Sequence, residues 1–209
     1  MWKKVALGGA GLLALAFVAL CAVIAMQPAT QHVARSRAIA ASPEDLWPLV
    51  SDLKAFSTWS PWEEIDPAMS KAFSDPSSGP GAWYTWDGND DVGKGRMEIA
   101  TVEPPLRVTE RLVFLEPFES KADVTLAFAK KGEATEVTWA FDMEQNFASK
   151  AFGLVMDMDA MLGADFEKGL ARLDAVATAR AAERIAAEQA AVEKAAAEAA
   201  AQAAAPPAP

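Results

Sequence analysis

Alternating hydrophobic and polar residues dominate the middle of the chain, from Met69 to Met143. Successive side chains of a strand point to opposite faces, so each alternating run predicts a strand with one buried face and one wet face. Polar turns and Pro-rich breaks, such as Pro104-Pro105, separate the runs. The pattern predicts antiparallel strands at 81–86, 93–102, 107–115, 124–128 and 137–143.

A further strand, at 32–40, and a helix precede this region. Ser42 can cap that helix, and Pro43 suits its first position. After the strands, apolar residues at helical spacing predict one long helix from Phe147 to Val176. Its first half is apolar almost all round, which predicts burial on more than one side. The order predicts an α+β fold, in which one curved antiparallel sheet wraps around the long C-terminal helix.

The N-terminal segment is different in character. Val5–Met26 carries no charge, and about 20 apolar residues span a bilayer core as a helix. The run is longer than the apolar core of a cleaved signal peptide, so it predicts an uncleaved membrane anchor. Lys3 and Lys4 precede it, which predicts a single-pass protein with a cytoplasmic N-terminus and an extracytoplasmic domain. Cys21 is the one cysteine, so the sequence allows no intramolecular disulfide.

The chain divides into a membrane anchor at 1–30, one domain at 31–176 and a tail at 177–209. The tail is rich in Ala and Glu and is expected to run from helical to disordered. It suits a polar spacer, with an oligomerisation element as the alternative. The formal net charge of −10 disfavours binding to a phosphate backbone, so no nucleic-acid partner is predicted.

Several segments resemble the START-like (SRPBCC) superfamily, the helix-grip fold of Bet v 1-type proteins. They are Ala41–Trp47 (ASPEDLW), Trp59–Trp62 (WSPW), Gly79–Trp86, Gly93–Met97 and Thr135–Trp139. The chain looks most similar to the bacterial polyketide cyclase/dehydrase-type subgroup. The resemblance implies a deep cavity between sheet and C-terminal helix that takes an apolar small molecule or lipid.

Large or adaptable apolar residues support such a cavity, because pockets are lined mainly by such groups and Met re-packs around irregular guests. The alternative is that they fill a solid core. The candidate ligand-binding residues are Trp83, Met97, Trp139, Phe141, Met143, Met156, Met158 and Met161.

Asp159 is the candidate catalytic residue. Its helical spacing from Leu162 and Phe166 puts it on the apolar stripe, where a buried carboxyl has a raised pKa and can act as an acid or base. The alternative is an ion pair with a Lys or Arg. His32 is the one histidine and is expected to lie beside the membrane, so no Ser-His-Asp set and no Cys/His zinc site is predicted in the domain. No metal and no cofactor is expected.

Three functions fit these residues. The leading interpretation is a membrane-anchored binding domain for an apolar or amphipathic molecule, lipid or polyketide-like. A cyclase or dehydratase that uses a buried carboxylate is the second, and a protein-interaction module with a filled core is the third. The lack of His and Cys in the cavity region favours binding over catalysis.

Overall fold

The computed structural model describes the backbone of residues 2–117 and 119–204 and the side chains of 13–117 and 119–198. The helices are α1 (Trp2–Met26), α2 (Pro43–Val50), α3 (Leu53–Phe56), α4 (Trp62–Ile65), α5 (Phe147–Phe152) and α6 (Met158–Ala204). The strands are β1 (Thr30–Ile39), β2 (Ser70–Phe73), β3 (Trp83–Asp87), β4 (Lys94–Glu103), β5 (Arg107–Glu116), β6 (Ser120–Lys131) and β7 (Ala134–Glu144).

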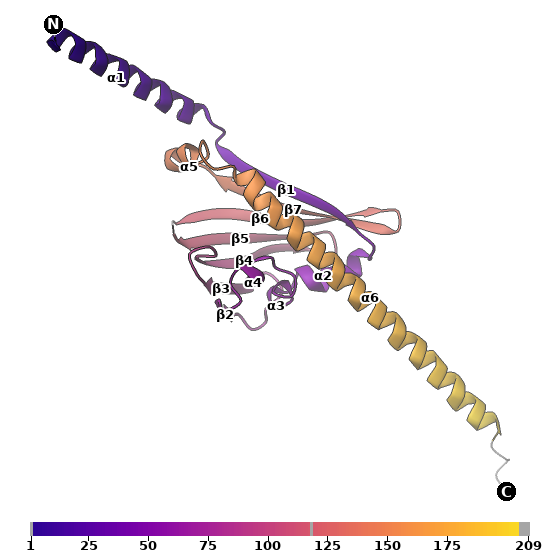
Figure 1. Ribbon diagram of the computed structural model, residues 1–209. Coiled ribbons are helices and arrows are strands. Elements are labelled where there is room, and N and C mark those ends of the chain that lie inside the picture. The colour runs from indigo at the N-terminus through magenta and orange to yellow at the C-terminus, as the bar shows by residue number, and fades with distance from the viewer. Residues whose placement is uncertain (1, 118, 205–209) are drawn as a thin grey trace.

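The strands form one antiparallel sheet in the order β1-β7-β6-β5-β4-β3-β2. The first strand therefore pairs with the last, from Thr30 opposite Glu144 to Ile39 opposite Thr135. Helix α6 crosses one face of this sheet, and α2, α3 and α4 gather beside it (Figure 1). The α+β arrangement of curved sheet and long C-terminal helix is confirmed.

An ionic seam holds α6 against the edge strand β1. Arg35 and Arg37 lie on the inner face of β1, two residues apart. The Arg35 guanidinium contacts Asp159 at 2.9 Å and Glu167 at 3.2 Å, and Arg37 Nε lies 2.9 Å from Asp174. Asp159, Glu167 and Asp174 are eight and seven residues apart, which is about two helical turns each time. These acids therefore lie along one side of α6.

Two buried glycines let the strands approach α6 closely. A Cβ on Gly163 would overlap the guanidinium of Arg35, and a Cβ on Gly169 would lie 2.6 Å from Cζ3 of Trp139. The Trp139 ring stacks on Phe166, with ring centroids 4.3 Å apart and planes within 7°. These contacts fix the helix over β1 and β7, and so set the space beneath it.

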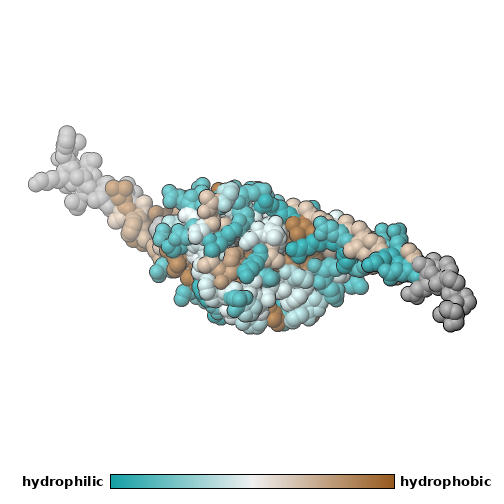
Figure 2. Space-filling view, turned by 90° about the horizontal axis from the view of Figure 1, so that it is seen from below, coloured by the Kyte–Doolittle hydropathy of each residue, from teal (hydrophilic) through white to brown (hydrophobic). Residues whose placement is uncertain are grey.

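The prediction of one unbroken helix from Phe147 to Val176 is wrong. Asn146 caps α5, which ends at Phe152, and α6 begins after Asp157, whose carboxylate accepts the Ala160 N–H. The prediction of burial on more than one side is wrong as well. Val155 is 81% exposed and Met161 is 52% exposed. The apolar residues lie in and around the connection between α5 and α6, where they are open to solvent. Patches of hydrophobic residues are seen among hydrophilic ones on the molecular surface (Figure 2).

The predicted transmembrane anchor at Val5–Met26 is also wrong. Among the helices as described, none is both long and apolar enough to cross a membrane. Residues 5–12 of the predicted anchor lie outside the described side chains. The predicted single-pass membrane location depends on this helix and is therefore wrong as well.

Candidate functional site

A cavity of about 1150 Å³ lies between the inner face of the sheet and helices α5 and α6. Its wall is mainly aromatic, aliphatic and Met side chains. Strands β3 to β7 supply Tyr84, Trp86, Met97, Leu112, Phe114, Ala122, Val124, Trp139, Phe141 and Met143, and the helices supply Phe56, Trp62, Phe152, Met158, Leu162 and Phe166.

Polar residues surround one end of the cavity. They are Glu119 in the β5–β6 connection, Lys121 near the start of β6, and Gln145 and Asn146 in the segment that leads into α5. Phe152, which is 49% exposed, also lies on the wall here. This end is therefore the mouth, and the short helix α5 forms one side of it.

Aromatic rings form the rigid part of the wall. Around Trp139 the edges of Phe56 and Trp62 lie at centroid distances of 6.1 and 5.8 Å, while Phe166 stacks on its face. On β3, Trp86 lies over Gly95, where any Cβ would overlap the indole. Edge-to-face and stacked rings keep fixed geometries, so this part of the wall holds its shape.

Five of the eight predicted ligand-binding residues line the cavity: Met97, Trp139, Phe141, Met143 and Met158. The other three lie elsewhere. Met156 lines a separate hollow of about 400 Å³ at the start of α6, and Met161 is 52% exposed. Trp83 lies on the outer face of the sheet, because it is one residue out of phase with Tyr84 and Trp86. There the Arg96 guanidinium covers its ring at 4.6 Å.

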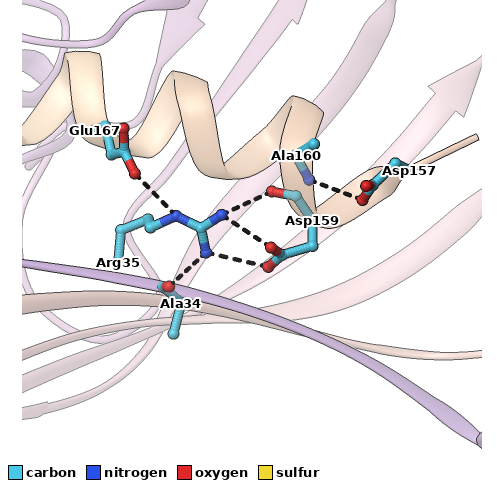
Figure 3. Close-up of polar contacts among 6 residues, drawn as sticks. All are labelled: Ala34, Arg35, Asp157, Asp159, Ala160 and Glu167. Carbon is cyan, nitrogen blue, oxygen red and sulfur yellow. Dashed lines mark hydrogen bonds and ion pairs between the residues drawn. The ribbon is translucent and has the colours of Figure 1, made fainter.

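Asp159 is not buried, which corrects the premise of its predicted role. Its side chain is 55% exposed and faces Arg35, which donates hydrogen bonds to both carboxylate oxygens and to the Asp159 carbonyl (Figure 3). The hydrogen bonds from Arg35 lower the pKa of Asp159 rather than raise it. The Asp159 carboxylate forms an ion pair with Arg35 at one end of the ionic seam. This agrees with the alternative interpretation of Asp159 as the partner of a Lys or Arg.

The residue that carries an inward-facing acid is Glu110, on β5. It is 2% exposed, and burial raises the pKa of its carboxyl to about 8. Glu110 was not among the residues predicted from the sequence, although the alternation of Val108, Glu110 and Leu112 puts all three on one face. A charged residue in phase with buried apolar neighbours was the available signal.

The acidic turn after β3 is held by its own contacts. Asn89 Oδ1 accepts the N–H groups of Asp91 and Val92, and Asp87 pairs with Lys94 at 2.6 Å. Across the described part of the chain, no three His, Cys, Asp or Glu residues are grouped in a way that could hold a metal ion.

The curved sheet, the long helix across it and the cavity between them define a START-like, helix-grip protein. The family model described as "Polyketide cyclase / dehydrase and lipid transport" matches residues 30–178, and the chain belongs to this family. Membership of this family indicates the binding of hydrophobic ligands. No functionally curated protein matches the chain.

Solved structures share the fold at low sequence identity. A Rhodobacter sphaeroides protein is 20% identical, with a TM-score of 0.52 over 72% of this chain and 98% of its own. A Chromobacterium violaceum protein is 12% identical, with a TM-score of 0.52 over 70% and 96%. The major latex-like protein 151 of Panax ginseng is 16% identical, with a TM-score of 0.50 over 71% and 97%. At these identities the likeness concerns the fold alone.

Proposed function

We propose that the chain binds an apolar or amphipathic small molecule, lipid or polyketide-like, in the cavity between the sheet and helices α5 and α6. The observation that carries the proposal is an apolar-walled cavity of about 1150 Å³. Ligand pockets have this composition and commonly measure about 300–1,000 Å³. Protein interiors normally contain few voids larger than a water molecule, so a filled core is the weaker interpretation.

The distribution of rigid and adaptable groups supports a guest of irregular shape. Trp139 and its aromatic neighbours form one fixed wall, whereas Met97, Met143 and Met158 lie on other sides of the space. Met side chains have several rotatable bonds and re-pack around a ligand at little cost. Leu154 and Val155 follow the cavity residues Phe152 and Gly153 in the chain and are exposed, so they provide an approach for a poorly soluble molecule.

The test uses N-phenyl-1-naphthylamine, an uncharged dye that fluoresces in apolar surroundings. Titration of the full chain with the dye should give saturable enhancement, with energy transfer from Trp62, Trp86 and Trp139, which line the cavity. Absence of saturable binding across the soluble range of the dye would contradict the proposal.

A matched pair of variants ties the binding to the cavity. Ala122 is 6% exposed and faces the cavity from β6, whereas Ala129 lies on the outer face of the same strand. Ala122→Trp places an indole in the ligand space and should weaken dye binding at least about tenfold, since steric overlap must displace the guest. Ala129→Trp introduces the same side chain outside the cavity and should leave the affinity unchanged.

A further inference from the structure

One buried tryptophan differs from the others in the partner of its indole N–H. Nε1 of Trp59 donates a hydrogen bond to the Leu49 carbonyl at 2.8 Å, and Nε1 of Trp86 donates to the Val92 carbonyl at 3.3 Å. Nε1 of Trp139 has no acceptor, and in the described part of the chain it is the one fully enclosed side-chain nitrogen or oxygen without a partner. Buried tryptophans usually bond their N–H, because an unpaired buried donor is costly.

The N–H edge of Trp139 is turned toward the cavity. The opposite edge faces α6, since a Cβ on Gly169 would lie 2.6 Å from Cζ3 and 3.4 Å from Cη2 of the indole. Gly169 does not line the cavity, whereas Leu162, about two turns nearer the start of α6, does. In an indole, Nε1 lies across the ring from Cζ3. The nitrogen is therefore on the side of the ring that leads to the open space and the mouth.

Only an uncharged acceptor suits this nitrogen. The rings of Phe56, Trp59 and Trp62 contact the Trp139 indole edge to face, at centroid distances of 6.1, 5.1 and 5.8 Å, and Phe166 stacks on it. None of these rings carries a charge. An indole N–H donates and does not accept, so its partner must be an acceptor. An anionic acceptor would lose its hydration here without gaining an opposite charge, which costs far more than the burial of a carbonyl or ether oxygen.

We propose that the Trp139 N–H is the polar anchor of the cavity and donates a hydrogen bond to one uncharged carbonyl or ether oxygen of an otherwise apolar ligand. This inference rests on the proposed function and specifies its ligand class. Because Nε1 is enclosed in the free protein, the ligand oxygen reaches it only after a wall side chain moves. Met97, Met143 and Met158 line the same cavity, and Met side chains re-pack at little cost.

The test compares two ligands of the same shape, each displacing N-phenyl-1-naphthylamine from the chain. One is 2-dodecanone, whose carbonyl accepts a hydrogen bond. The other is 2-methyl-1-dodecene, in which a methylene group replaces that oxygen. Trp139→benzothienylalanine keeps the shape of the indole but has sulfur in place of the N–H. In this variant the ratio of ketone affinity to alkene affinity should fall about tenfold, the effect of one lost hydrogen bond.

The matched control makes the same replacement at Trp59, which contacts Trp139 but does not line the cavity. Trp59→benzothienylalanine loses the hydrogen bond to Leu49 and should keep the affinity ratio of the unaltered chain. Circular dichroism checks that each variant is folded.

Nuclear magnetic resonance of the unaltered chain gives a second readout, which does not depend on a variant. The indole N–H signal of Trp139, assigned through its proximity to the Phe166 ring, should move downfield with the ketone and much less with the alkene, because hydrogen bonding deshields the proton. An unchanged affinity ratio in the folded Trp139 variant, or equal shifts with both ligands, would overturn the anchor while saturable dye binding leaves the cavity function intact. Absence of dye binding would overturn both proposals.

Discussion

The buried carboxyl of Glu110 makes the stability of this protein depend on pH in a defined direction. The pKa of the group rises from the ordinary value of 4.5 to about 8 on burial. Between these values the native state holds a proton that the unfolded state has released, so the free energy of unfolding falls as pH rises. The contribution is fully present below pH 4.5 and is lost by about pH 8.

The magnitude follows from the size of the shift. Each pH unit well inside this window costs about 1.4 kcal/mol per proton, and the slope falls to about half of that at each of the two pKa values. Between pH 5 and pH 8 the native state therefore loses about 3 kcal/mol. This is a large share of the typical stability of a single domain, about 5–15 kcal/mol. Glu110→Gln has nearly the same shape and no titration. Its free energy of unfolding, relative to that of the unaltered chain, should rise by about 3 kcal/mol over this range.

Urea unfolding at pH 5, 6.5 and 8, followed by Trp fluorescence, measures this difference. Titrations shared by the two chains cancel in the subtraction. Glu133→Gln, at an exposed position in the β6–β7 turn, is the matched control and should run parallel to the unaltered chain. If Glu110→Gln also runs parallel across the three pH values, the carboxyl is solvated or paired in the native state, and the reasoning from its burial is refuted.

Two further predictions concern α6. Gly163→Ala should lower the free energy of unfolding by about 1–2 kcal/mol, although Ala is the better helix former, because its Cβ must displace the guanidinium of Arg35; thermal and urea unfolding measure this, and a stabilised variant would contradict the packing. Deletion of 185–209 should change stability by less than about 0.5 kcal/mol and leave dye binding unchanged, because Ile185 and Val192 are exposed; a loss of binding would assign the tail a part in the site.

The sheet was predictable because its physics is local. Period-two alternation identifies the inner faces of β4 to β7, and cross-strand pairing then follows from short turns. The start of α2 was also predicted correctly. The Ser42 hydroxyl accepts a hydrogen bond from the Asp45 N–H, as expected of an N-cap residue. These features depend on neighbours a few residues apart, which the sequence displays directly.

The C-terminal region was harder to predict, because the helical spacing of apolar residues continues across the break between α5 and α6. The cap at Asp157 was visible as an acid before Met158, but the periodicity of the flanking residues masked it. Apolar residues there indicate burial only when a partner covers them, and Val155 at 81% exposure has none among the described residues. At the N-terminus, apolar composition at Val5–Met26 alone likewise gave a wrong prediction.

The site was half predictable for the same reason. Met97 and Trp139 follow from strand phase, and the error at Trp83 is an error of phase by one residue. The placement of Tyr84 beside Met97, and of Met97 beside Leu112, could not be foreseen, because it depends on the registers of β3, β4 and β5. The prediction that Asp159 is buried was wrong because its partner, Arg35, is 124 residues away in the chain.

Glu110 also bears on why this core is built as it is. Leu at position 110 would continue the apolar phase of Val108 and Leu112, avoid the pH-dependent loss of about 3 kcal/mol and remove an unpartnered carboxyl. A chain under selection for stability alone has no reason to keep an acid there. Local choices that conflict with the surrounding core are expected at functional sites. Glu110→Leu should give a more stable protein, most clearly at pH 8, and urea unfolding of the two chains at pH 5 and pH 8 measures the difference.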